Sequence, residues 1–496
     1  MILSELFRDI EFETVAGDPD VVSVSRIEYD SRKIQRGELF VCLPGAKFDG
    51  HDYAFGAYQR GCRAFLCERK LNLPEDAYQA LTSDTRSALA AVSATFYGYP
   101  AEKVNIIGIT GTKGKTTTAL LIQSILEGNG IRCAYIGSNG VIINGRHTET
   151  VNTTPESREL QHYFATMVRE RVTHAVIEVS SQALEHNRVQ GISFDVCVFT
   201  NLGVDHIGEG EHASLEEYRG AKRKLFTDYN CKAAVINADD EAAEFITAGI
   251  TCPVVTFSMG NRDADFCGEG SRIYRDESSL GIAFDCTNAD VTTPVMMRTP
   301  GLFSAYNGLA AIAVGAYYGI SVADAAETLA VTPVGGRFEV VDSLPGRTFI
   351  IDYAHNGMSL TSALTVLREY KPNRLICVFG SVGGRTRGRR KELAEAASAL
   401  ADYSIITSDN PDFEEPSAIT DEILSYFDQS VPHEVIIDRF EAVRRAVFMA
   451  ERGDIVLFAG KGHETYQLVK GEKVPFVERE IIKDALRSVE LGKLFK

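Results

Sequence analysis

The chain lacks several features that would assign it to a common class. Its ten cysteines, scattered from Cys42 to Cys377, contain no C-x-x-C pair, so neither a zinc ribbon nor a disulfide framework is predicted. No basic block offsets the net charge of −17, which argues against a nucleic-acid partner. The first residues lack the basic head of a signal peptide, and no apolar run approaches the length of a membrane span. We therefore expect a cytoplasmic protein with no membrane partner.

The length and composition indicate a multidomain globular protein. At 496 residues, with 45% hydrophobic and 24% charged residues, the chain is too long for one core, and about two to four domains are expected. We predict three units, residues 1–100, 101–336 and 337–496, and expect a monomer. The boundaries fall near Tyr99-Pro100 and at Gly335-Gly336-Arg337.

A glycine-rich turn follows a short apolar run and carries the strongest functional signal. Residues 104–110 are apolar and β-branched, which predicts a buried strand. The run breaks at Gly111-Thr112-Lys113-Gly114, and Lys115-Thr116-Thr117-Thr118 opens a predicted helix that Gly128 closes. Free N–H groups at such a helix start bind phosphates, the lysine reaches the outer phosphates, and a hydroxyl binds magnesium. Ile109 stands where the longer phosphate-loop form has its first glycine, so this is the shorter G-T-x-G-K-T form.

The rest of the chain alternates strands with helices, which predicts an α/β fold. We expect a P-loop-type, mostly parallel sheet in the central unit and a Rossmann-like, doubly wound sheet in the C-terminal unit. Ligands bind at the carboxyl ends of such strands, so the polar residues found there are functional candidates. These segments are Glu178–Ser181, Asn201 with Asp205-His206, Asn237–Asp240, Asp352–His355, Ser408–Glu415 and Gly460–Glu464.

Individual residues of these segments allow more than one interpretation. Glu178 and His206 suit magnesium near a triphosphate, although a histidine at a strand end is more often a structural hydrogen-bonding residue. By spacing alone, Lys222 is an ordinary surface lysine of a helix. A cluster of arginines suits carboxylates or phosphates but is also compatible with a solvated basic loop. Its members are Arg385, Arg387, Arg389 and Arg390.

Taken together, the motifs resemble the Mur ligase family, from Tyr29 to Glu464. The similarity is greatest to the members that add a diamino acid to UDP-MurNAc-L-Ala-D-Glu. The motifs are G-T-K-G-K-T at Gly111, Asn152–Pro155, Glu178–Ser181, Asn201-Leu202, Asp205-His206, Asn237–Asp240, Gly336–Glu339, Asp352–His355, Asp409–Pro411 and Gly460–Glu464.

The resemblance implies an ATP-dependent ligase of peptidoglycan precursor synthesis with three domains, which bind the UDP substrate, ATP and the amino acid in chain order. The D-Glu carboxylate attacks the γ-phosphate of ATP, and the amine of the amino acid then displaces phosphate from the resulting acyl phosphate. ATP and Mg²⁺ are the expected cofactors. Positioning and neutralisation of phosphate charge supply most of the catalysis.

The resemblance also assigns roles residue by residue. The catalytic residues are Lys115, Glu178, His206 and Lys222. The ATP-binding residues are Gly111, Thr112, Lys113, Gly114, Lys115, Thr116, Thr117, Asn237, Arg337 and Asp352. The residues for UDP-MurNAc-dipeptide are Ser31, Thr153, Thr154, Ser180 and Arg188. The amino-acid residues are Arg385, Asp409, Asn410, Asp412, Gly460 and Glu464. The metal ligands are Thr116, Glu178, His206 and Lys222, the last as a carbamate that presents an anionic oxygen.

One departure from the family pattern bears on the acceptor. Ligases that add meso-diaminopimelate resemble D-N-P-R, in which the arginine meets the distal carboxylate, whereas this chain has Asp412 there. An aspartate repels that carboxylate and favours a terminal ammonium, so we predict L-lysine as the acceptor. The same ligase acting on ornithine or meso-diaminopimelate is an alternative. A P-loop ATPase without an amino-acid acceptor is another.

Overall fold

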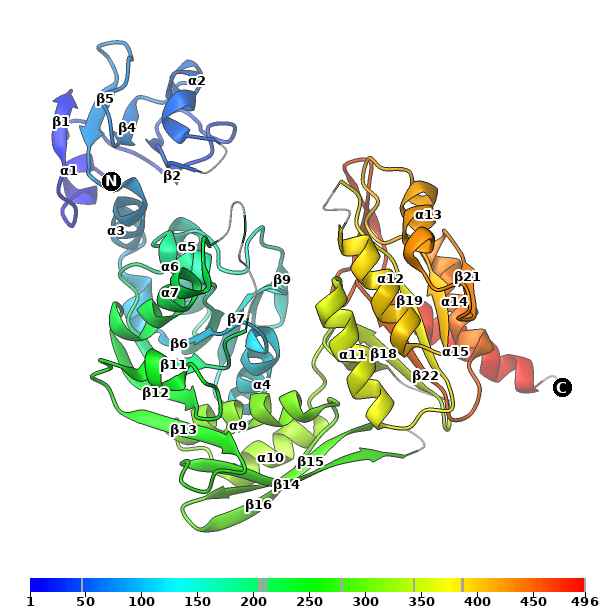
Figure 1. Cartoon of the computed structure of the whole chain (residues 1–496). Helices are drawn as coiled ribbons and strands as arrows, with labels where there is room; N and C mark the ends of the chain where they lie inside the picture. Colours follow the sequence, from blue (N-terminus) through cyan, green and yellow to red (C-terminus); the bar gives the residue numbers. More distant parts are fainter. Residues whose placement is uncertain are drawn as a thin grey trace. The chain divides into compact units, whose positions relative to one another are not determined.

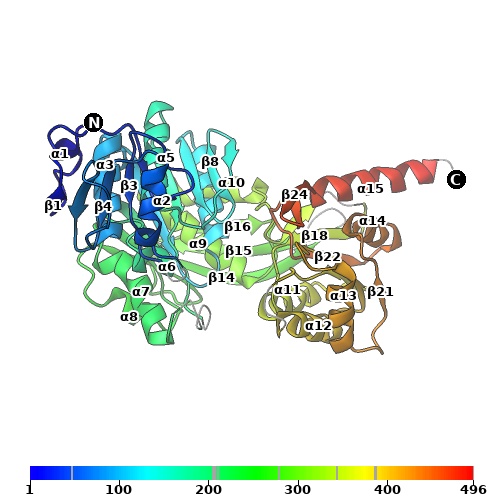
Figure 2. The same ribbon diagram turned by 90° about the horizontal axis from the view of Figure 1, so that it is seen from above.

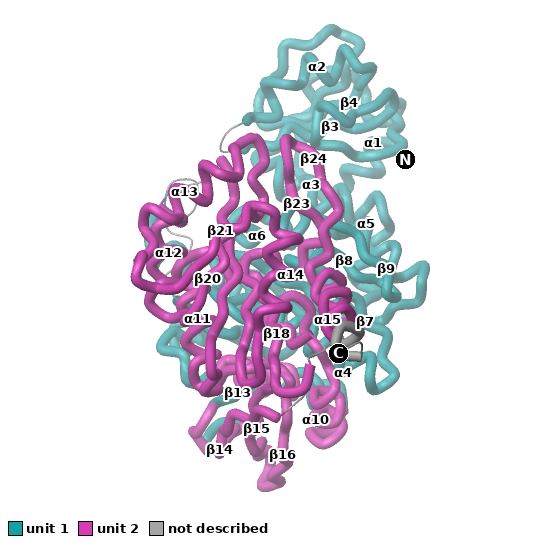
Figure 3. The backbone as a smooth tube through the Cα atoms, turned by 90° about the vertical axis from the view of Figure 1, so that its right-hand side faces the viewer, with its two compact units in different colours: residues 1–258, 263–265, 313–319 teal, residues 259–262, 266–312, 320–496 magenta. Residues whose placement is uncertain are grey.

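The computed structural model describes residues 1–45, 48–203, 208, 212–276, 280–341, 344–384 and 388–494. The chain divides into two compact units (Figure 3). Unit 1 comprises residues 1–258, 263–265 and 313–319, and unit 2 comprises residues 259–262, 266–312 and 320–496. No helix within the described residues is long and apolar enough to cross a membrane.

Unit 1 begins with a small five-stranded sheet in the order β1-β5-β4-β3-β2. Its strands are β1 (Glu13–Ala16), β2 (Ile27–Glu28), β3 (Leu39–Val41), β4 (Ala64–Cys67) and β5 (Tyr78–Leu81). Helices α1 (Leu3–Leu6) and α3 (Thr85–Tyr97) share one core with the sheet, and α2 (Ala54–Gln59) shares another. A 3-10 turn, Gly50–Tyr53, leads into α2.

The large sheet of unit 1 carries the phosphate-binding turn (Figure 1). Its order is β13-β12-β11-β6-β10-β7-β8-β9, parallel from β13 to β7 and antiparallel beyond. The strands are β6 (Asn105–Thr110), β7 (Cys133–Gly137), β8 (Gly140–Ile143), β9 (Arg146–Thr148), β10 (His174–Glu178), β11 (Phe194–Phe199), β12 (Cys231–Asn237) and β13 (Val254–Met259). The strand predicted over residues 104–110 is thus confirmed as β6.

Helices cover this sheet because successive buried residues of each strand point to opposite faces. One core contains residues of α5 (Ser157–Arg169), α6 (Ser181–Glu185) and α7 (Leu215–Thr227). Helix α4 (Lys115–Gly128) instead packs on β7 and β10, and a short helix, α8 (Ala243–Thr247), follows β12.

Unit 2 contains an antiparallel ladder that the sequence interpretation missed. Strands β14 (Phe266–Arg275), β15 (Leu280–Asn288) and β16 (Val291–Met297) pair as a meander, and α10 (Val322–Val331) packs on β16. Ala289 and Asp290 join β15 to β16 with φ values of 47° and 66°. Two consecutive positive φ values define a tight hairpin turn, but no glycine marks it in the sequence. Helix α9 (Leu302–Tyr317) has residues in both units.

The second sheet of unit 2 has the order β17-β18-β22-β19-β20-β21, parallel except for β17. Its strands are β17 (Glu339–Val341), β18 (Thr348–Asp352), β19 (Leu375–Phe379), β20 (Tyr403–Ile406), β21 (His433–Val435) and β22 (Ile455–Ala459). The five parallel strands agree with the Rossmann-like sheet predicted for the C-terminal unit.

Five helices cover this sheet. Residues of α11 (Gly357–Glu369), α12 (Gly388–Leu400) and α13 (Pro416–Tyr426) build one core, and residues of α14 (Arg439–Met449) and α15 (Glu478–Leu494) build the other (Figure 2). A hairpin of β23 (Tyr466–Val469) and β24 (Glu472–Pro475) follows β22. The fold is therefore doubly wound, as predicted.

Candidate active site

The turn between β6 and α4 has a backbone that requires glycine. Gly111 has a φ of 151° and Gly114 a φ of 84°. A Cβ atom on Gly111 would overlap the hydroxyl of Thr200, which lies beyond β11. Asn201 holds the turn, because its carbonyl accepts from the Thr112 N–H and its side chain accepts from the Lys113 N–H, each at 2.9 Å.

The lysine of the turn folds back over it. Lys115 Nζ donates to the carbonyls of Gly111 at 2.7 Å and Thr112 at 3.1 Å. The N–H groups of the first turn of α4 follow this loop, and N–H groups at a helix start beside an ammonium are chemically suited to an anion. The structure thus brings Gly111, Thr112, Lys113, Gly114, Lys115, Thr116 and Thr117 together as predicted.

Glu178 ends β10 beside this loop and is fully buried. Its carboxylate accepts hydrogen bonds from the Tyr135 hydroxyl at 2.5 Å, the Ser138 N–H at 3.0 Å and the Thr116 hydroxyl at 3.0 Å. A second bond to Glu178 comes from the Ser138 hydroxyl at 3.3 Å. Gly137 lies so close that a Cβ atom there would overlap the carboxylate.

These groups fit magnesium by their chemistry. Mg²⁺ binds few protein ligands, typically one or two carboxylates or hydroxyls, and takes the rest from water and substrate phosphates. Glu178 and Thr116 supply such hard oxygen donors beside a phosphate loop. No group of three or more His, Cys, Asp or Glu side chains within the described ranges is arranged to hold a metal ion. His206, the third predicted ligand, lies outside those ranges.

Lys222 is not the surface lysine that its helical spacing alone suggests. It lies on α7 with only 1% of its surface exposed, and its Nζ donates to the Gly111 carbonyl at 2.9 Å. The ammonium also lies 4.2 Å from the centre of the Tyr218 ring. The Tyr218 hydroxyl bonds to Thr112 Oγ1 at 3.1 Å, so both α7 side chains contact the phosphate loop.

The residues predicted for UDP-MurNAc-dipeptide form a connected group next to Glu178. The Thr154 hydroxyl donates to the Glu178 carbonyl at 2.8 Å, and Arg188 donates to the Thr154 carbonyl at 3.2 Å. Thr154 also contacts Ser180 Oγ at 3.3 Å. Thr153 joins through a hydroxyl contact to Ser138 of 3.1 Å. Ser31, the fifth predicted residue, follows β2 in a turn, and the described residues show no hydrogen bond between it and this group.

Asn237 connects the end of β12 to the phosphate loop. Its amide donates to the Thr200 carbonyl at 2.8 Å, and the Thr200 hydroxyl donates to the Lys113 carbonyl at 2.7 Å. Asn237 is buried, so its amide helps to fix the loop itself.

In unit 2, Asp352 ends β18 and is held by backbone donors. Its carboxylate accepts from the N–H groups of Phe338 and Ala354, both at 2.8 Å. Burial raises the pKa of Asp352, and the nearby Arg337 guanidinium opposes that rise. Arg337 stacks on the Tyr353 ring at 4.7 Å.

The predicted amino-acid residues meet at a lysine that the sequence interpretation missed. Lys461 is fully buried, and its Nζ donates to Asn410 Oδ1 at 2.8 Å and Glu464 Oε2 at 2.6 Å. Asp409 Oδ1 lies 3.6 Å away, and the Asn410 amide also donates to Glu464 at 3.0 Å. Gly460 has a φ of 109°, and a Cβ atom there would press on Asp409. In the sequence, the position of Lys461 between Gly460 and Glu464, two of the predicted amino-acid residues, could have indicated its role.

Asp412 and Arg390 have structural partners within the protein that the sequence interpretation did not predict. Asp412 has a φ of 53°, and its carboxylate accepts from the Gly471 N–H in the turn of the β23–β24 hairpin at 2.8 Å. Arg390 is not a loop residue available to a ligand, because it lies in α12, is buried, and bonds to Glu414 and Glu422. Arg385, the cluster member assigned to the amino acid, lies outside the described residues.

Three family models match the chain in order. They are the Mur ligase family catalytic domain over residues 23–111, the Mur ligase middle domain over residues 109–315 and the Mur ligase glutamate ligase domain over residues 336–462.

Among curated proteins, the UDP-N-acetylmuramoyl-L-alanyl-D-glutamate–2,6-diaminopimelate ligase of Syntrophomonas wolfei is 40% identical over 493 residues, which is 98% of this chain and 99% of that protein. The protein of the same name from Geobacillus kaustophilus is 39% identical over 480 residues, 95% of this chain and 96% of that one.

Solved structures of similar fold also belong to ligases of this kind. A structure of a ligase with that same name superposes with a TM-score of 0.69 at 28% identity and covers 99% of both chains. MurF from Thermotoga maritima in complex with ADP has a TM-score of 0.59 at 18% identity, covering 96% of this chain and 99% of that one. Although the chain forms two compact units, the three successive family models and the superposed structures confirm the predicted three-domain α/β fold class. The chain therefore belongs to the Mur ligase family and is an ATP-dependent ligase that forms an amide bond.

Proposed function

We propose that the protein adds 2,6-diaminopimelate to the D-Glu carboxyl of UDP-MurNAc-L-Ala-D-Glu. The observation that carries this proposal is the end-to-end similarity to relatives named for that reaction, at 40% identity in one case. The site chemistry is compatible, because the chain has an anion-binding loop and a separate group of carboxylate, amide and ammonium side chains suited to an amino acid.

The proposed reaction proceeds in two transfers. A carboxylate oxygen of D-Glu attacks the γ-phosphorus of ATP, the bond to the β-phosphate oxygen breaks, and ADP leaves. The amine of the acceptor then attacks the acyl carbonyl, and phosphate leaves with the former carboxylate oxygen while the amine loses a proton. Carboxylates are poor electrophiles, so phosphorylation supplies the leaving group that amide formation needs.

Residues of the phosphate loop stabilise the first transfer. The N–H groups after Gly111 and the Lys115 ammonium neutralise phosphate charge, and the Glu178 carboxylate orients the Thr116 hydroxyl. Mg²⁺, when bound through Thr116 and Glu178, supplies further positive charge to the phosphates. His206 would supply a nitrogen ligand to a second ion, and a carbamate on Lys222 would supply an oxygen ligand. Asn237, Arg337 and Asp352 are the proposed contacts to the nucleotide.

The proposed substrate contacts follow the observed groups. Thr153, Thr154, Ser180, Arg188 and Ser31 bind the UDP-MurNAc-dipeptide. The amino acid is held by Asp409, Asn410, Gly460, Glu464 and Arg385. Within this set, Glu464 suits the amine of the acceptor because its carboxylate is an ion-pair partner.

L-lysine remains a second candidate acceptor, and Asp412 is the observation that favours it. The negative charge of Asp412 disfavours a distal carboxylate. However, Asp412 also has a structural reason to be aspartate, since its carboxylate accepts from Gly471 and its φ of 53° suits Asp or Asn. That reason is independent of the acceptor, and the relatives described above are not named for lysine.

An acceptor panel tests the proposal. Phosphate release from ATP is measured with UDP-MurNAc-L-Ala-D-Glu and Mg²⁺, with meso-diaminopimelate, L-lysine or L-ornithine added separately. We expect turnover with meso-diaminopimelate, and Asp412→Asn should keep the hairpin contact while removing the charge. If Asp412 selects the acceptor, this variant changes the ratio of kcat/KM values for the acceptors. Turnover with L-lysine alone contradicts the diaminopimelate assignment, and release indifferent to every acceptor supports the ATPase alternative.

We further propose that the enzyme acts as a cytoplasmic monomer. Its proposed substrates, ATP and a nucleotide-linked sugar, support that location. Sedimentation of the full chain at micromolar concentration tests the monomer, and a dimer mass contradicts it.

A further inference from the structure

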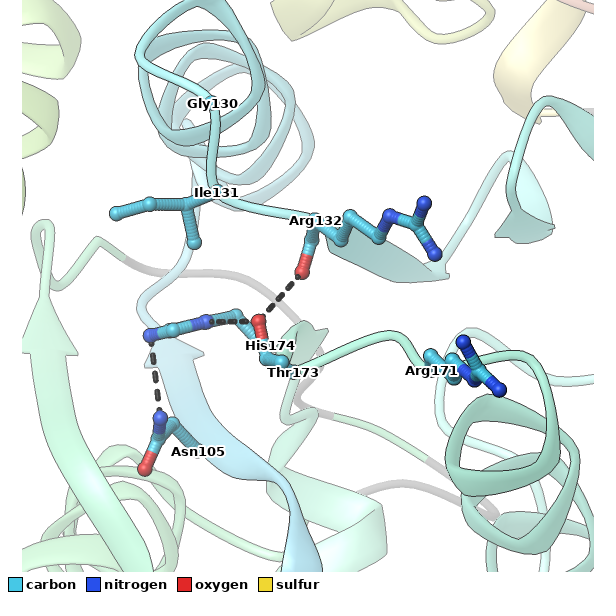
Figure 4. Close-up of a pocket in the computed structure, with 7 residues that line it drawn as sticks. All are labelled: Asn105, Gly130, Ile131, Arg132, Arg171, Thr173 and His174. Atoms are coloured by element: carbon cyan, nitrogen blue, oxygen red, sulfur yellow. Dashed lines mark hydrogen bonds between the residues drawn. The ribbon is translucent and has the colours of Figure 1, made fainter.

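A shallow, wide-open cavity of about 670 Å³ lies at the end of the large sheet opposite the phosphate loop (Figure 4). Asn105 and His174, the first residues of β6 and β10, line it together with Arg132 and Arg171. The same two strands end at the phosphate loop and at Glu178. Its volume matches that of small-molecule sites, but its open shape suits a ligand held mainly by charge at the surface.

The arginines follow two helices whose ends are already closed by backbone hydrogen bonds. After α4, Gly130 has a φ of 79°, and the Ile131 N–H donates to the Leu126 carbonyl at 2.9 Å. After α5, Arg171 occupies the corresponding place with a φ of 58°, and the Val172 N–H donates to the Met167 carbonyl at 2.9 Å. Neither guanidinium is therefore needed to cap these carbonyls.

Arg171 stands where the backbone favours glycine. The left-handed conformation costs little for glycine and more for a residue with a Cβ atom, and α4 uses Gly130 at the equivalent position. Lys371 after α11 shares this left-handed backbone with a φ of 49°, so the conformation of Arg171 supplies a matched control position and is not itself the sign of a function.

A hydrogen-bonded chain fixes the backbone at Arg132. Asn105 Nδ2 lies 3.2 Å from His174 Nε2, His174 Nδ1 lies 2.9 Å from Thr173 Oγ1, and that hydroxyl donates to the Arg132 carbonyl at 3.3 Å. The N–H groups of Thr173 and His174 donate to the same carbonyl at 3.2 Å and 3.1 Å. With the Asn105 amide donating, the imidazole is neutral, and burial lowers the pKa of His174. The positive charge of the cavity therefore comes from the two arginines.

Arg132 and Arg171 are both exposed, and the described residues place no carboxylate in an ion pair with either of them. Across the described ranges, neither the Arg132 nor the Arg171 side chain makes a hydrogen bond or an ion pair. This is notable in a chain with 68 acidic and 51 basic residues, where carboxylates are plentiful. Arg146, for example, pairs with Glu170, next to Arg171 in the sequence.

We propose that this cavity is a second ligand site, which binds a small molecule carrying clustered anionic oxygens through Arg132 and Arg171. Planar guanidinium groups suit carboxylates and phosphates equally, so both chemistries belong to the proposed class. The site is separate from the phosphate loop and does not depend on the identity of the amino-acid acceptor.

Site-resolved labelling of arginine tests this proposal. The full chain is treated with phenylglyoxal, and labelling of each arginine is measured by peptide mass spectrometry with inorganic phosphate in one arm and succinate in the other. We expect at least one anion to slow labelling of Arg132 and Arg171 together, with the same half-maximal concentration. Exposed Arg60, which follows α2 in the N-terminal part of the chain, should label at an unchanged rate.

A matched pair of glycine variants separates binding from folding. Arg171→Gly should raise the thermal midpoint or leave it unchanged, because it relieves a left-handed residue, yet it should weaken protection of Arg132 at least about tenfold. Lys371→Gly changes an equivalent left-handed residue after α11, with a φ of 49°, and should leave that protection intact. Unchanged labelling of Arg132 with both anions overturns the proposal, as does protection that survives in Arg171→Gly.

Discussion

Replacing Lys461 by methionine should destabilise unit 2 far more than an ordinary lysine substitution. Lys461 is fully buried, and the side chains of Asp409 and Glu464 that face it are only 3% and 15% exposed. Methionine keeps most of the volume but leaves the buried carboxylate of Asp409 and the largely buried one of Glu464 without their common countercharge. Removing one partner from a buried ion pair costs about 3–5 kcal/mol, so we expect a loss of that size in the free energy of unfolding of this unit.

The assay is urea unfolding followed in parallel with the acceptor KM. Lys473→Met is the matched control, since Lys473 is an exposed residue of β24 whose ammonium lies 4.1 Å from the Tyr466 ring. An exposed contact of this kind contributes about 0.5–1 kcal/mol. Lys461→Met should also raise the acceptor KM, because Asn410 and Glu464 lose their shared donor. A loss equal to that of Lys473→Met would refute the reasoning.

Three further predictions concern the large sheet. Gly111→Ala should abolish ATP turnover while the chain stays folded, because its Cβ atom would overlap Thr200 and displace the phosphate loop. The rate of ATP turnover is measured, with circular dichroism as the control for folding. Full activity of the variant contradicts the prediction. In ¹³C-bicarbonate, a carbamate signal should appear in the NMR spectrum and be absent from Lys222→Ala; a spectrum identical for both chains shows that Lys222 is unmodified. Burial lowers the pKa of His174 below its ordinary value of 6.5, so the unfolded chain takes up a proton first and stability should fall as the pH drops from about 6.5 through the lowered pKa. In His174→Gln that acid-side loss should shrink, as measured by thermal midpoints; an unchanged pH profile contradicts the assignment.

Local sequence patterns predicted the parts of the site that lie within one strand-turn-helix segment. The phosphate loop was predictable because its glycines, lysine and threonine are adjacent in the chain, and because an apolar run and an amphipathic helix flank them. Glu178 was predictable for a similar reason, since parallel strands place their carboxyl ends along one edge.

Contacts between distant segments were not predictable in the same way. Lys222 was interpreted as a surface residue because helical spacing does not reveal its hydrogen bond to the Gly111 carbonyl, which lies 111 residues earlier in the chain. Arg390 looked like a ligand-binding residue because Glu414 and Glu422 are more than twenty positions away. The role of Asp412 was likewise hidden, since its partner Gly471 belongs to a hairpin 59 residues later.

The antiparallel ladder of unit 2 was missed for a different physical reason. Its strands β15 and β16 are joined by a turn in which Ala289 and Asp290 adopt positive φ values without a glycine. Short apolar runs also do not reveal whether their neighbours are parallel or antiparallel.

The central claim, that the chain activates a carboxylate by phosphorylation, is tested most directly by oxygen transfer. UDP-MurNAc-L-Ala-D-Glu labelled with ¹⁸O in the D-Glu side-chain carboxylate is converted with ATP, Mg²⁺ and meso-diaminopimelate, and the released phosphate is analysed by mass spectrometry. Our account predicts one ¹⁸O atom in each phosphate released from fully labelled substrate, because the acyl phosphate passes its bridging oxygen to phosphorus. Phosphate without ¹⁸O would show that water, and not the substrate carboxylate, attacks ATP, and would contradict the ligase mechanism.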